Sequence, residues 1–89
     1  MKRNADFMLR EIAGEVVLVP TGRATQNFNG MITLNEVAAF IWKNLDEAGS
    51  KEKLVSMILD EFEVEEETAR RDVDGFIGAL SEHGMVEES

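Results

Sequence analysis

The stretch of sequence that decides the fold is Leu34-Asn35-Glu36-Val37-Ala38-Ala39-Phe40-Ile41-Trp42. Asn35 is a typical N-cap residue, because its side-chain oxygen can accept a hydrogen bond from a free N–H group of the first helical turn. Apolar side chains then recur at helical spacing, at Ala38, Ile41, Trp42 and Leu45. The stretch therefore predicts the end of an extended segment followed by a helix. We expect its tryptophan, the only one in the chain, to be a core residue.

Two extended segments precede this stretch. Residues 7–13 and 15–20 have the composition of strands, and Gly14 between them can adopt the positive φ that a tight hairpin needs. Residues 31–34 predict a third short strand after a turn at Asn29-Gly30. The sequence leaves open whether residues 26–28 pair with this third strand.

Two more helices are expected after the first one. Gly49 is a natural C-terminal stop for the first helix, and Ser50 is a good cap for the second. A third helix is predicted to begin near Glu65 and to stop at Gly84, after which residues 85–86 can fold back onto the core. Three strands followed by three helices predict an α+β winged helix-turn-helix with an N-terminal three-stranded antiparallel sheet.

Length and composition favour one ordinary globular domain over residues 1–89. The chain has no cysteine, which excludes disulfides and thiolate metal sites, and its single histidine, His83, has no cysteine or second histidine to act with. We therefore expect no enzyme activity, no cofactor and no metal. The lack of a long apolar run and of a signal-peptide pattern predicts a cytoplasmic protein away from membranes.

Charge is distributed unevenly along the chain. Residues 1–35 carry four Lys or Arg and three acids, whereas residues 36–89 carry five and fifteen. Proteins that bind nucleic acid neutralise phosphates with a basic surface. The acidic helical half therefore predicts no affinity for nucleic acid, even in a helix-turn-helix fold.

Almost the whole chain resembles the PqqD-like family. Residues 9–12 and 14–20 are similar to the family's opening hairpin, residues 30–42 to its third strand and first helix, and residues 72–86 to its closing helix and tail. The family often has Thr where this chain has Val37. The resemblance implies a recognition element for ribosomally made, post-translationally modified peptides. Such a protein holds the leader of a precursor peptide for a modifying enzyme, often a radical SAM enzyme.

The resemblance also implies where the leader binds. The leader would add a strand to the edge of the third strand and place side chains against the third helix. The candidate peptide-binding residues are Met31, Ile32, Thr33, Arg70, Arg71, Asp74, Ile77, Gly78 and Ser81.

Some of these candidates have alternative roles. Arg70 and Arg71 are also spaced to pair with Glu66 and Glu67 along the helix surface. The helical glycines, Gly75 and Gly78, are explained equally well by close approach of a peptide or by tight internal packing.

Two other functions compete with the adaptor. One is a winged-helix transcription regulator, which the acids of the third helix disfavour. The other is an interaction module that forms a homodimer through its exposed edge strand.

Overall fold

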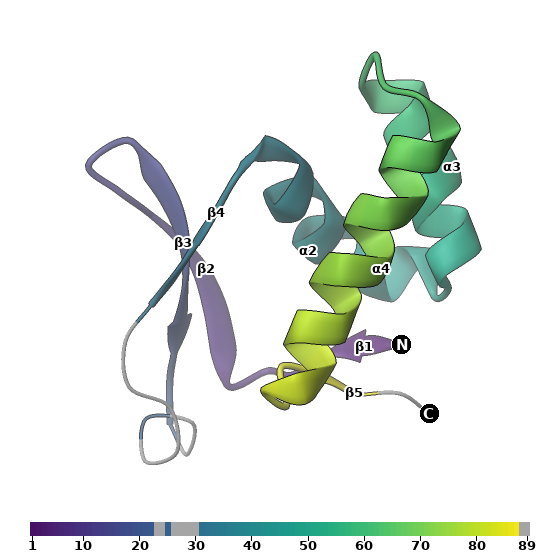
Figure 1. Ribbon diagram of the computed structural model, residues 1–89. Coiled ribbons are helices and arrows are strands. Elements are labelled where there is room, and N and C mark those ends of the chain that lie inside the picture. The colour runs from purple at the N-terminus through teal and green to yellow at the C-terminus, as the bar shows by residue number, and fades with distance from the viewer. Residues whose placement is uncertain (23–24, 26–30, 88–89) are drawn as a thin grey trace.

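The computed structural model describes residues 1–22, 25 and 31–87. A three-stranded sheet lies beside three helices, and a pair of very short strands joins the two ends of the described chain (Figure 1). With the labels of Figure 1, the elements are β1 (Lys2–Arg3), β2 (Phe7–Ile12), β3 (Glu15–Pro20), β4 (Ile32–Leu34), α2 (Glu36–Ala48), α3 (Lys51–Glu61), α4 (Glu66–Glu82) and β5 (Val86–Glu87). The α+β winged helix-turn-helix predicted from the sequence is confirmed.

The sheet is antiparallel, with the order β2-β3-β4. Ala13 and Gly14 both have positive φ, 52° and 83°, at the turn between β2 and β3. Such a pair of positive φ angles gives the two strands the right-handed twist of a tight hairpin. The hairpin is the wing of the fold, and it leaves β2 and β4 at the two edges. The turn expected at Asn29-Gly30 and any pairing of residues 26–28 lie outside the described residues.

The helix boundaries follow the capping residues. The Asn35 side chain accepts a hydrogen bond of 2.8 Å from the Ala38 N–H, and the Ser50 hydroxyl accepts one of 3.2 Å from the Lys53 N–H. Gly49 ends α2 in the left-handed region, with φ 73°. These three predicted caps are confirmed. They could be predicted because each one depends on local chemistry alone.

One apolar core joins the sheet to the helices. Trp42 is 3% exposed and belongs to this core, as predicted. Each helix contributes one face, and β3 and β4 contribute Leu18 and Leu34. The buried residues of α4 are Ala69, Val73, Ile77 and Leu80. None of the helices in the described part of the chain is long and apolar enough to cross a membrane.

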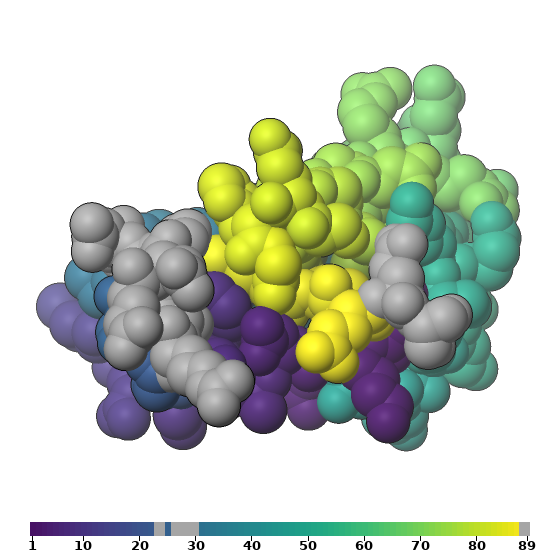
Figure 2. Space-filling view, turned by 90° about the horizontal axis from the view of Figure 1, so that it is seen from below, coloured from purple at the N-terminus to yellow at the C-terminus, as the bar shows by residue number. Residues whose placement is uncertain are grey.

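The two ends of the described chain lie side by side. β1 pairs with β5 in an antiparallel register, with Lys2 opposite Glu87 and Arg3 opposite Val86. The space-filling view shows the purple N-terminal residues next to the yellow C-terminal ones (Figure 2). Met85 is fully buried and Val86 is 6% exposed, so the predicted return of this segment to the core is confirmed. The β1–β5 pairing itself was not predicted from the sequence.

Candidate functional site

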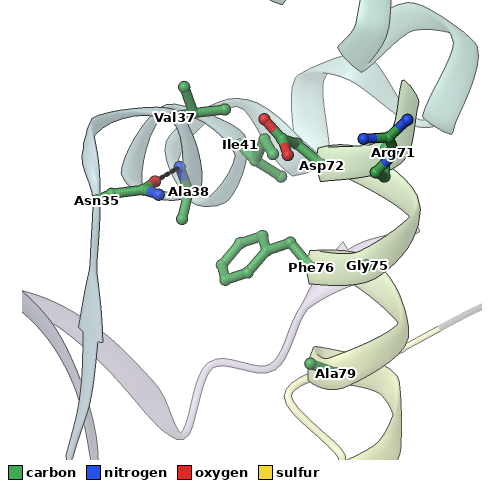
Figure 3. A pocket seen from close by; sticks show the side chains of 9 residues that line it. All are labelled: Asn35, Val37, Ala38, Ile41, Arg71, Asp72, Gly75, Phe76 and Ala79. Carbon is green, nitrogen blue, oxygen red and sulfur yellow. Dashed lines mark hydrogen bonds between the residues drawn. The ribbon is translucent and has the colours of Figure 1, made fainter. Parts of the chain in front are cut away.

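A surface pocket of about 370 Å³ lies between the beginning of α2 and the middle of α4. Figure 3 shows its lining side chains, which come from these two helices and from the residue that caps α2. They are Asn35, Val37, Ala38, Ile41, Arg71, Asp72, Gly75, Phe76 and Ala79.

The pocket begins where the edge strand ends. β4 spans Ile32–Leu34, and the next residue, Asn35, already lines the pocket. Among the residues that the structure describes, β4 has one sheet neighbour, β3. A strand added to the other side of β4 would therefore run toward the pocket. Such an edge offers unpaired backbone N–H and C=O groups to another chain.

The pocket is mostly apolar. In Figure 3 the Phe76 ring points from α4 toward α2, where Ala38 lies. Phe76 is half-buried and packs against the core, and Ile41, which also lines the pocket, is fully buried. A pocket of this kind can take an apolar side chain at little conformational cost, because its walls are already held by the core.

The opposite flank of α4 is tied to α3 by ion pairs. The Arg70 guanidinium lies 2.6 Å from the Glu52 carboxylate and 3.1 Å from that of Glu66. The hydrogen bond from Arg70, helped by its charge, holds the pKa of Glu52 below its usual value, and the same bond raises the pKa of Arg70. Asp74 lies 3.6 Å from Lys51, at the start of α3.

The structure separates the helix residues that the sequence grouped as one site. Arg70 and Asp74 contact α3 and do not line the pocket. Ile77 is 1% exposed, so its side chain belongs to the core and is not presented to a ligand. Gly78 and Ser81 are exposed on α4 but lie outside the pocket lining.

Arg71 is the predicted helix residue that does line the pocket. Its guanidinium lies 3.5 Å from the Glu67 carboxylate, so the predicted pairing along the helix is present as well. On the strand side, Met31 is 58% exposed. Thr33 is exposed and Ile32 is half-buried at the edge strand itself.

The sequence interpretation missed three residues of the α4 lining, Asp72, Phe76 and Ala79, and it considered Gly75 only as one of two small residues that a peptide could approach closely. These residues repeat at helical spacing beside the core stripe. That spacing was visible in the sequence as a second, partly apolar stripe next to the buried one.

The two helical glycines have no internal packing role. A Cβ atom added at Gly75 or at Gly78 would meet nothing within 4 Å. The alternative of a tight crossing inside the protein is therefore wrong. Each glycine weakens the helix by about 1 kcal/mol relative to alanine. Gly75 lines the pocket, where the missing side chain leaves more space for a ligand.

The lining of this pocket contains few chemically reactive side chains. No group of three or more histidine, cysteine, aspartate or glutamate side chains able to hold a metal occurs among the described residues. The charged groups of the lining are one guanidinium and one carboxylate, on neighbouring residues of α4.

The fold and the groove define a small winged-helix protein with an edge strand that leads into an apolar pocket. The family described as coenzyme PQQ synthesis protein D (PqqD) matches residues 15–86. The chain therefore belongs to the PqqD family.

Two solved structures share this fold. One is TbiB1 in complex with the TbiA(beta) leader peptide, with a TM-score of 0.75 and 28% sequence identity, covering 100% of this chain and 98% of that chain. The other is lasso peptide synthetase B1 complexed with the leader peptide, with a TM-score of 0.74 and 25% identity, covering 98% of this chain and 96% of that chain. A comparison with curated protein sequences gave no significant match.

Proposed function

We propose that this protein is an adaptor that binds the leader region of a ribosomally made precursor peptide. The observation that carries the proposal is the open edge of β4 leading directly into the apolar pocket between α2 and α4. Two structurally similar proteins of nearly the same length are bound to leader peptides.

The leader would bind as an additional strand. Backbone hydrogen bonds to β4 would fix its register, and alternate side chains would point toward α4. Ile32 and Thr33 supply edge backbone, while Phe76 and Ala38 supply the apolar contact for one leader side chain. Met31, exposed just before β4, extends the same edge.

A second partner follows from this role. A protein that only holds a leader needs an enzyme that modifies the rest of the precursor, and we propose a separate maturation enzyme, such as a radical SAM enzyme. The protein itself would contribute no catalytic group. This part of the proposal rests on membership of the PqqD family.

The leader and a second copy of this chain would compete for the same edge. Dimerisation through β4 would pair the strand that the leader needs. We therefore expect any such dimer to dissociate when the leader is added. This is testable by sedimentation with and without peptide.

The decisive experiment takes short peptides encoded by the neighbouring genes as candidate precursors. The labelled leader is titrated with the protein and followed by fluorescence anisotropy, and the same precursor without its leader is the control. We expect micromolar or tighter binding that requires the leader. Equal binding of the leaderless peptide, or none of either, would refute the adaptor.

Backbone hydrogen exchange then locates the added strand. The sheet has two edges, β2 and β4, and β2 serves as the internal control. Leader binding should protect amides of Ile32–Leu34 and leave those of Phe7–Ile12 unchanged. Protection at β2 alone would place the leader on the wrong edge for this pocket.

Duplex DNA provides the test of the competing regulator. At low salt the protein should show no binding, because fifteen acids in residues 36–89 face only five basic side chains. Salt-sensitive micromolar binding of DNA would favour a transcription regulator.

A further inference from the structure

The two charged side chains of the pocket differ in what they contact. Arg71 is paired with Glu67 at 3.5 Å. The Asp72 carboxylate has no hydrogen bond and no ion pair within the described part of the chain. In Figure 3 the Asp72 carboxylate points toward Ile41 and α2, across the end of the pocket, whereas the Arg71 guanidinium points away from the Phe76 ring.

A carboxylate in this position favours a cation beside the apolar contact. The net charge of the protein is −9, so its long-range field attracts basic peptides. Asp72 would give this general attraction a local target, because an unpaired carboxylate can accept charge-assisted hydrogen bonds from Lys or Arg. An acidic leader residue at the same place would meet like charge.

The distance between the two contacts sets the spacing in the peptide. Asp72 and Phe76 lie four residues apart on α4, which is a rise of ~6 Å along a helix. Two residues of an extended strand span ~6.6 Å. Residues two apart in a strand also point to the same side, so one can reach Phe76 while the other reaches Asp72.

We propose that the pocket selects leaders in which an apolar residue and a Lys or Arg stand two positions apart. The apolar side chain lies against Phe76 and Ala38, and the basic one pairs with Asp72. This inference rests on the proposed leader binding and adds the chemical class of the leader.

The test is a selection from a displayed library of random twelve-residue peptides on three immobilised proteins. These are the wild type, Asp72→Lys and the matched control Asp74→Lys. Both substitutions make the same change in net charge on the same helix, but Asp74 pairs with Lys51 on the α3 side. The wild type and Asp74→Lys should enrich an apolar residue with Lys or Arg two positions away. Asp72→Lys should enrich Asp or Glu there and keep the apolar residue.

A charge swap quantifies the contact. In a selected peptide, changing the basic residue to Glu should weaken binding to the wild type roughly two- to fivefold, the range expected for the loss of an exposed ion pair. Asp72→Lys should recover most of that loss with the Glu peptide. Melting curves of the variants establish that each one is folded.

The results that would contradict the role of Asp72 differ from those that would contradict leader binding. Enrichment of an apolar residue with no basic partner, or the same charge preference in the wild type and Asp72→Lys, would overturn the role of Asp72 and leave leader binding intact. A shift in Asp74→Lys equal to that in Asp72→Lys would reduce the effect to overall charge and overturn it too. If the wild type enriches no peptide, both this inference and the proposed function fail.

Discussion

Replacing either of the two helical glycines of α4 by alanine should stabilise the protein. Larger side chains at the same two positions should then show which of them lines the groove. Gly75→Ala and Gly78→Ala each remove the helix penalty of glycine, about 1 kcal/mol in a helix interior. No neighbour opposes the added methyl group, since a Cβ at either position meets nothing within 4 Å. For a domain of this size, a gain of ~1 kcal/mol raises the melting temperature by roughly 4–8 °C.

Thermal melting followed by far-UV circular dichroism measures this gain for each single variant and for the double variant. The two gains should be nearly additive, because neither methyl group has a partner to share. A lower melting temperature in either alanine variant would refute the reasoning, since it would mean that the glycine is needed for internal packing.

Larger side chains at the same positions test the position of the groove. Gly75 lines the pocket and Gly78 does not. Gly75→Leu should therefore weaken leader binding strongly, whereas Gly78→Leu should leave it nearly unchanged, and both proteins should stay folded. Both affinities are measured by anisotropy with the same labelled leader. The opposite ranking would mean that the leader binds the face of α4 that carries Gly78 and not the face that carries Gly75.

Three further predictions concern the scaffold. Trp42→Ala should cost ~3–5 kcal/mol of unfolding free energy, because Trp42 is 3% exposed in the core; a denaturant titration with a change under 1 kcal/mol would contradict its placement. Asn35→Ala should cost about 1 kcal/mol by removing the cap of α2, and Asn35→Asp, which keeps an acceptor, should retain most of the stability in the same titration. The lowered pKa of Glu52 means that its pairing with Arg70 stabilises the fold above the ordinary carboxyl pKa and is lost as pH falls through the lowered value. Glu52→Gln should thus melt slightly below the wild type at pH 7 and level with it in strong acid, and a gap that widens in acid would reverse the sign.

Local signals explain why so much of the fold could be predicted from the sequence. Asn35, Gly49 and Ser50 act on the backbone within a few residues, so their chemistry is visible without tertiary structure. The β1–β5 pairing differs, since it joins Arg3 to Val86 across the whole chain. Two-residue strands have no periodicity to detect, and the packing of β1 against α2 and of β5 against α4 brings them together.

The pocket lining was harder to predict because it depends on the rotation of one helix. Asp74, Gly78 and Ser81 do share a face of α4, as their spacing indicated, but the spacing does not say which neighbour that face meets. The ion pair of Asp74 with Lys51 shows that α3 flanks this side of α4. The pocket lies on the other flank, where Gly75 and Phe76 stand. The predicted residues and the pocket lining therefore differ by a rotation of roughly one residue position, which is about 100° around a helix.

Helix α4 has three surfaces: a buried stripe, a side that pairs with α3 and a side that lines the pocket. Together they suggest how a small protein can hold a peptide. The buried stripe fixes the helix against the core, whereas the exposed pairs made by Arg70 and Asp74 each contribute little to stability. Rigidity of the pocket wall therefore comes from the core. On α4, Phe76 is the lining residue that also packs against this core. Substitutions at Asp72 and Gly75 should change binding with little loss of stability. A truncation of Phe76 should reduce both, so the difference between these two kinds of variant separates recognition of the leader from support of the groove.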